Sequence, residues 1–101
     1  MPISDRPWGS ISESDYTPEQ FCRAALIDLN PPGEEKVKGL CKLPVREPNG
    51  ALNRNGVHAA AGRFGQTDAP PAAKRAAARR LMAAYAELDE EPPESVMMMA
   101  R

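Results

Sequence analysis

Apolar residues recur at helical spacing in three stretches of the chain, at residues 17–30, 53–64 and 67–88. This spacing is typical of amphipathic helices that bury one face. Small residues dominate the apolar face of the third stretch, which indicates close packing against another helix. That face comprises Ala73, Ala77, Leu81, Ala84, Tyr85 and Leu88.

Residues with capping side chains stand at the start of each stretch. Thr17 precedes Pro18, and Gln20 follows three positions after Thr17, which is the pattern of a capping box with proline in the first turn. Asn53 is a good cap for the second helix, and Thr67-Asp68 is the expected cap of the third. The run Asn30-Pro31-Pro32-Gly33 should end the first helix.

Between the first two helices the chain is expected to be extended. Residues 40–45 alternate loosely between apolar and polar, and Pro44 limits them to an edge strand. Pro48-Asn49-Gly50 is a turn signal.

The predicted fold class is therefore mainly α. We expect a small three-helix domain over residues 17–91, with the short extended or edge-strand segment before its second helix. An extended N-terminal arm over residues 1–16 should precede the domain, because prolines, glycine and serines discourage helix there. A short C-terminal tail should follow over residues 92–101.

Composition limits the size of the core. The chain has 101 residues, enough for one small domain. Its apolar share is 42%, but much of this is alanine and only 5% of the residues are aromatic. We therefore expect a thin core that neighbouring molecules could stabilise.

Charge is segregated along the chain although the net charge is only −1. Residues 1–35 carry two basic and seven acidic residues, residues 36–86 carry ten basic and two acidic, and residues 87–101 carry one basic and five acidic. The three blocks thus have net charges of −5, +8 and −4. This pattern indicates either pairing of the acidic ends with the basic middle, or docking to a charged partner.

Two sets of residues are candidates for partner binding. Arg75, Arg79 and Arg80 cluster in the N-terminal half of the third helix, where the helix dipole disfavours basic side chains, so a partner is one reason for their position. Apolar side chains of the arm form the second set, above all Trp8, together with Ile3 and Ile11. Trp8 should either cover the core of its own domain or fill a groove on another chain.

Catalytic and metal-binding signals are absent from the sequence pattern. His58 and the distant Cys22 and Cys41 have no ligand spacing, so no metal site and no cofactor are predicted. His58 is expected to be a partly buried structural residue. No signal peptide is recognised, so a reducing compartment and free, buried thiols are expected. No apolar run is long enough to span a membrane.

The segment LPVREPNGALNRNGVHAAAGRF, the helix that follows Asp-Ala-Pro-Pro, and the ending LDEEPPES carry a resemblance to a known family. Together with the opening YTPEQFCRAALIDLNPPG, they resemble a small uncharacterised domain of tailed-phage and prophage head-morphogenesis regions. That domain occurs alone or beside the prohead protease of phage Mu type. The resemblance spans residues 8–96 and implies a role in virion assembly in the bacterial host cytoplasm. It implies no catalysis, because no protease motif is present.

The expected function is that of a non-enzymatic virion structural protein. It would be a minor capsid or decoration protein that binds the major capsid lattice through its arm and its basic helix, or that self-associates within a lattice. A regulatory or targeting module for the prohead protease is one alternative. A basic accessory protein for DNA packaging is another, although the aromatic residues are not interleaved with the basic ones as base stacking requires.

Overall fold

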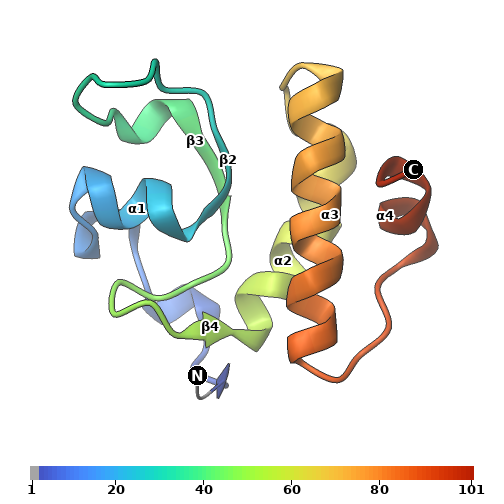
Figure 1. The fold of residues 1–101 in the computed structure, drawn as a ribbon. Coiled ribbons are helices and arrows are strands. Elements are labelled where there is room, and N and C mark those ends of the chain that lie inside the picture. Colours follow the sequence, from blue (N-terminus) through green and yellow to red (C-terminus); the bar gives the residue numbers. More distant parts are fainter. Residues whose placement is uncertain (1–2) are drawn as a thin grey trace.

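The computed structural model describes residues 3–101 and shows a mixed α and β domain (Figure 1). Within this range the chain forms four α-helices and two sheets of two strands each, joined by short 3-10 helices. In chain order the elements are β1 (Ile3–Ser4), α1 (Pro18–Ala24), β2 (Ala25–Asp28), β3 (Cys41–Pro44), β4 (Leu52–Asn53), α2 (Arg54–Arg63), α3 (Pro71–Glu87) and α4 (Glu94–Met99).

The prediction of a mainly α, three-helix fold is wrong because the first predicted helix ends early. Helix α1 stops at Ala24, and residues 25–28 continue as strand β2, which pairs antiparallel with β3. Leu26 and Ile27 are adjacent and both buried, as in a strand covered on both faces. The pairing with a distant segment overrides the helical spacing that the local sequence shows. The edge strand expected at residues 40–45 is confirmed as β3.

Local capping signals predicted two of the three helix starts. The Thr17 hydroxyl accepts a hydrogen bond from the Gln20 amide at 3.1 Å, and the Gln20 side chain accepts one from the Thr17 amide at 2.8 Å. The Asn53 side chain accepts from the Gly56 amide at 2.7 Å. The predicted Thr67-Asp68 cap is wrong, because α3 begins at Pro71 after Pro70, without a side-chain cap.

The main core lies around α3. Figure 1 shows α1 and the β2–β3 pair on one side of this helix and α4 on the other. Side chains of β2, β3, α2, α3 and α4 meet there, and Leu81, Val57 and Val96 are fully buried. A second, smaller cluster lies between α1 and β3; it comprises Tyr16, Phe21, Cys22, Ala24 and Cys41, with Ile11 and Ala25 packed against it.

The predicted arm lies against the domain. Strand β1 pairs in parallel with β4, which places Ile3 opposite Leu52. Trp8 is half-buried, and its ring covers Gly56 so closely that a Cβ built on Gly56 would lie 2.9 Å from the ring atom Cζ3. Of the two possibilities for Trp8, this structure shows the packing on its own domain.

Ion pairs hold the arm and the chain after α3 to helix α2. The Arg54 guanidinium donates to Asp5 Oδ1 at 2.7 Å and also pairs with Glu90. His58 Nε2 lies 2.7 Å from Glu90 Oε1. The acidic ends of the chain thus pair in part with its basic middle. Of the two explanations for the segregated charge, the structure shows pairing within the chain.

Glu47 anchors the arm from inside the domain. Its side chain is only 4% exposed, accepts from Asn53 Nδ2 at 2.9 Å, and pairs with Arg6 at 3.3 Å. Burial alone would raise the pKa of Glu47, but hydrogen bonds from Ser4 and Asn53 and the charge of Arg6 outweigh it and hold the pKa below its usual value.

Replacing Gly56 with alanine should displace Trp8, because the new methyl group would overlap the indole ring. Trp8 is the single tryptophan of the chain, so its fluorescence should shift to longer wavelength as the ring becomes exposed. Gly62→Ala in the same helix is the matched control, since nothing lies within 4 Å of its Cβ position. It should leave the spectrum unchanged and stabilise α2 by about 0.5–1 kcal/mol. Equal spectra for both variants would contradict the packing of Trp8 on Gly56.

Stability should fall in acid in a manner that depends on Glu47. A carboxyl group whose pKa is lower in the folded state stabilises the fold above its unfolded pKa, about 4.3 for Glu. That contribution is lost as the pH falls through the folded pKa. Urea unfolding of the wild type and of Glu47→Gln should therefore differ most near neutral pH, with the wild type more stable. The difference should shrink below about pH 4. A difference independent of pH would show that the charge of Glu47 contributes nothing.

Candidate functional site

Two adjoining hollows form a groove beside α1, and arginine side chains line it. The first hollow, about 140 Å³, lies between α1 and the turn at residues 46–50. The second, about 230 Å³, lies between the β2–β3 pair and α3. Both hollows are lined by Arg23, Ala24 and Arg46, and Arg80 of α3 lines the second. We call this surface, defined by Arg23, Arg46 and Arg80, the arginine groove.

The second hollow of the arginine groove combines apolar side chains with charged ones. Small and aliphatic residues of α1, β2, β4 and α3, together with Val45 just after β3, line the second hollow: Ala24, Ala25, Leu26, Val45, Leu52, Ala83 and Ala84. Guanidinium groups beside apolar side chains suit a peptide segment that carries both carboxylates and short apolar side chains.

The backbone fixes two of the three arginines. Arg80 donates to the Leu26 carbonyl at 2.8 Å and so caps the edge of β2 that faces α3. Arg46 donates to the Gly50 carbonyl at 3.2 Å and lies 3.6 Å from Glu87 Oε1. Arg23 projects from α1 and is exposed. Each guanidinium has five N–H donors, so these contacts leave donors for a ligand.

Tyr16 fixes the main chain of Arg46. The Tyr16 hydroxyl donates a hydrogen bond to the Arg46 carbonyl. Burial, with the nearby charges of Glu47 and Asp15, raises the pKa of Tyr16 to about 12, so the hydroxyl remains a donor at neutral pH. The wall of the groove is thereby tied to the segment just before α1.

The residues predicted for partner binding do not share one surface. Arg79 donates to the Ala100 carbonyl at 3.1 Å and so faces α4, whereas Arg80 faces β2. Arg75 is exposed on α3. Ile11 packs against the smaller cluster, and Ile3 and Trp8 lie against β4 and α2 as described above.

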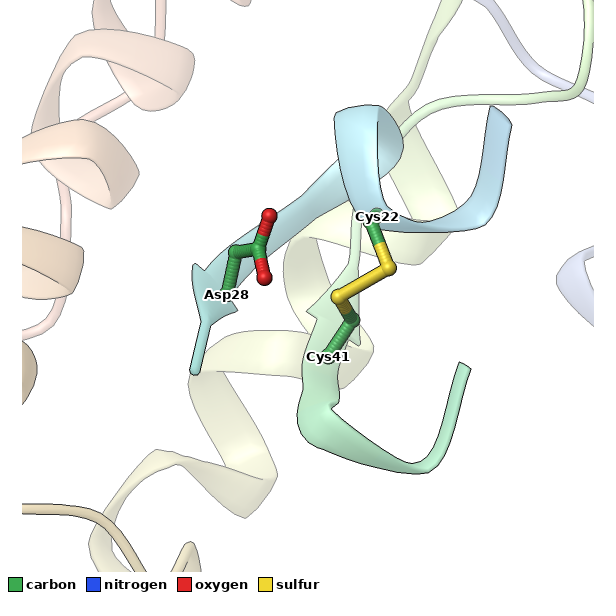
Figure 2. A group of neighbouring side chains, drawn as sticks. All are labelled: Cys22, Asp28 and Cys41. Carbon is green, nitrogen blue, oxygen red and sulfur yellow. A yellow bond between two sulfur atoms is a disulfide. The ribbon is translucent and has the colours of Figure 1, made fainter. Parts of the chain in front are cut away.

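The expectation of free thiols is wrong. Cys22 of α1 and Cys41 of β3, which are 19 positions apart in sequence, form a disulfide with Cα atoms 5.2 Å apart (Figure 2). The pairing of β2 with β3 returns the chain to α1 and so brings the two cysteines together, which their separation in sequence gave no reason to expect. The disulfide crosses the smaller cluster and fixes α1 to the β2–β3 pair.

Polar side chains from the end of β2 lie beside the disulfide. The Asp28 carboxylate reaches within 4.8 Å of both sulfur atoms (Figure 2). It pairs with Lys36 at 2.6 Å and accepts a hydrogen bond from Asn30 Nδ2 at 2.8 Å. Burial alone would raise the pKa of Asp28, but the hydrogen bonds from Lys36 and Asn30 outweigh it and lower the pKa.

His58 has the structural contacts expected of it but is more exposed than predicted. Its side chain is 45% exposed, and besides Glu90 it stacks near Tyr85, with ring centroids 6.0 Å apart. The contact between His58 and Glu90 links α2 to the chain that follows α3.

Arg23 and Arg46 are the residues of the groove that sequence reasoning missed. Arg23 follows Cys22 in the first predicted helix, and Arg46 precedes the Pro48-Asn49-Gly50 turn. Because Arg23 and Arg46 are far apart in sequence, the sequence alone gave no sign that they lie close together in the fold. The excess of basic residues in the middle of the chain was the one available signal for Arg46, and there was none for Arg23.

Comparison of the chain with protein families, curated proteins and solved structures found no match. In the part of the chain that the structure describes, no helix combines the length and apolar character needed to cross a bilayer.

Removing the disulfide should destabilise the domain by about 3 kcal/mol, the usual effect of a crosslink that closes a loop of this length. The double variant Cys22→Ser, Cys41→Ser should show this loss in denaturant unfolding relative to the oxidised wild type. Reduced wild-type protein is the matched control and should lose a similar amount. A double variant as stable as the oxidised wild type would contradict a stabilising crosslink.

Proposed function

We propose that this chain is a non-enzymatic structural protein of a tailed-phage virion, a minor capsid or decoration protein that binds an acidic segment of the major capsid protein. Its resemblance to domains of head-morphogenesis regions supports the setting. The arginine groove supports the mode of binding, and it is the observation that carries the proposal.

The groove replaces the arm as the proposed contact. Ile3 and Trp8 are engaged within the chain, by strand pairing and by packing on Gly56. The groove instead offers three arginines beside apolar side chains. Of the two carboxylates in its lining, Glu47 is buried and paired inside the domain, and Glu87 lies 3.6 Å from Arg46. Its charge therefore complements an acidic peptide, with small apolar side chains filling the space beside α3.

Repetition compensates for the modest size of each contact. One groove of this volume holds only a few side chains of a partner, so a single contact is expected to be weak. A capsid lattice presents the same acidic segment many times, and contacts made through several copies raise the effective concentration. Binding should also weaken as salt is added, because the attraction is electrostatic.

Quantitative mass spectrometry of purified, nuclease-treated phage particles tests the assignment to the virion. A copy number that tracks the major capsid protein supports decoration, whereas about a dozen copies would move the protein to the portal or neck. Presence in immature proheads but not in finished particles would overturn the proposal in favour of a module of the prohead protease.

Charge reversal tests the groove itself. Arg23→Glu should weaken binding to capsids by about tenfold to a hundredfold, since one lost contact between charged groups costs about 1.5–3 kcal/mol. Arg63→Glu on α2 removes the same charge from a surface outside the groove and should bind as the wild type does. Binding can be measured by sedimentation of purified protein with capsids.

Two outcomes would contradict binding in the groove. Equal loss in both variants would show a response to net charge alone. If instead Arg75→Glu, on the outer face of α3, weakened binding and Arg23→Glu did not, the contact would lie on that helix. A steep loss of affinity for free DNA in both variants would favour the DNA-packaging alternative.

A further inference from the structure

Four acceptor atoms converge on one point beside the disulfide, and the side-chain amide of Asn30 occupies that point. Asn30 Nδ2 lies 2.8 Å from Asp28 Oδ1, 3.2 Å from Cys41 Sγ, 3.3 Å from the Val37 carbonyl oxygen and 3.6 Å from Cys22 Sγ. An amide nitrogen carries two hydrogens, so it cannot satisfy four acceptors at once. Two sulfur atoms, a carboxylate oxygen and a carbonyl oxygen instead form a set that suits a metal cation.

The chemistry of this set depends on the redox state of the cysteines. In the disulfide the two sulfurs are neutral and bonded to each other. After reduction they can ionise to thiolates, which are strong ligands for Zn²⁺, and Asp28 adds a third anionic ligand. We propose that reduction of the Cys22–Cys41 disulfide converts this cluster into a Zn²⁺ site, with Cys22, Cys41 and Asp28 as ligands and water or the Val37 carbonyl in the fourth position.

The geometry requires only short side-chain movements. The three ligand atoms already lie within 4.8 Å of one another. A tetrahedral zinc ion with bonds of about 2.0–2.3 Å separates its ligand atoms by about 3.3–3.8 Å. The sulfurs must therefore move apart once their bond is broken, and the Asp28 carboxylate must move inward. Asn30 must turn its amide away from the centre, and Lys36 must release Asp28.

A dithiol reductant supplies the electrons and protons that reduce the disulfide. The dithiol gives two electrons to the disulfide and is itself oxidised to a disulfide, while its two protons leave Cys22 and Cys41 as thiols. Binding of Zn²⁺ then releases both protons as the thiolates form bonds to the metal. A disulfide oxidant, such as the oxidised form of that dithiol, would reverse the sequence: it takes up the two electrons and two protons and becomes a dithiol, the Cys22–Cys41 bond forms again, and the ion is expelled.

An acidic hollow offers a path for the cation. This hollow, about 450 Å³, is open to solvent and is lined by Cys22 and Asp28 of the cluster. Glu19, Glu34 and Glu35 line it as well, against Arg23 and Lys36. The three carboxylates should raise the local concentration of divalent cations at the entrance.

The test is a titration of the purified chain with Co²⁺ and Zn²⁺ after reduction by a dithiol and removal of the excess reductant. Co²⁺ bound by two thiolates in tetrahedral geometry gives strong charge-transfer and d–d absorption, and competition with a chromophoric chelator gives the affinity for Zn²⁺. The reduced wild type should bind one ion per chain. The oxidised wild type, which keeps its fold, should bind none.

Asp28→Asn separates a built site from a simple pair of thiols, because it keeps both cysteines. It should weaken Zn²⁺ binding by at least about tenfold to a hundredfold, the range seen even for supporting residues of metal sites. Lys36→Met is the matched control: it removes the ion that competes for Asp28 and should leave the affinity equal or higher. Circular dichroism during the same titration should show that Zn²⁺ raises the melting temperature of the reduced wild type.

Three results would overturn the proposal. One is reduced wild-type protein that binds Zn²⁺ no more tightly than Asp28→Asn, because the cysteines alone would then explain the binding. Another is a wild type that binds equally well when oxidised. The last applies if the reduced chain unfolds. Zn²⁺ should then restore the helical circular dichroism signal of the wild type but not that of Asp28→Asn. A wild type whose helical signal Zn²⁺ does not restore would refute the site.

Discussion

The side chain of Asn53 is the point on which the arrangement of the domain depends. It is fully buried, accepts from the Gly56 amide, and donates to Glu47 Oε2 and to the Arg6 carbonyl. Its backbone amide donates to the Val45 carbonyl at 2.9 Å. One residue thus starts α2, holds the turn after β3 and fixes the arm. A buried polar network of this kind is stable only when every member is paired, so these three parts of the chain must form together.

The same network determines the charge of the groove. Because Asn53 and Arg6 draw the Glu47 carboxylate inward, that negative charge is buried and paired within the domain instead of opposing the guanidinium of the neighbouring Arg46. Tyr16 fixes the Arg46 carbonyl from the other side. The contacts of Glu47 with Asn53 and Arg6, which hold the arm against the domain, therefore also favour an electropositive surface between α1 and α3. The fold and the proposed binding surface rest on the same few hydrogen bonds.

Features set by neighbouring residues could be predicted from the sequence, and features set by distant ones could not. The caps at Thr17 and Asn53 depend on three or four consecutive residues, as does the turn at Gly50, whose φ of 93° is positive. Strand β2 was missed because Ala25, Leu26 and Leu29 fit the helical spacing, and only the partner strand β3 makes residues 25–28 a strand. The disulfide and the grouping of Arg23 with Arg46 and Arg80 follow from that pairing. Once β2 was taken for helix, neither could be foreseen.

Helix α1 connects the two surfaces proposed for function. Cys22 and Arg23 are adjacent on it, one in the disulfide and the other in the arginine groove. In reducing surroundings Cys22 and Cys41 would be thiols, and in oxidising surroundings they would form the disulfide. In the first state a bound Zn²⁺ would fix α1 to β3, and in the second the disulfide would do so. The groove would then keep its shape in both redox states, because either link holds Arg23 opposite Arg46.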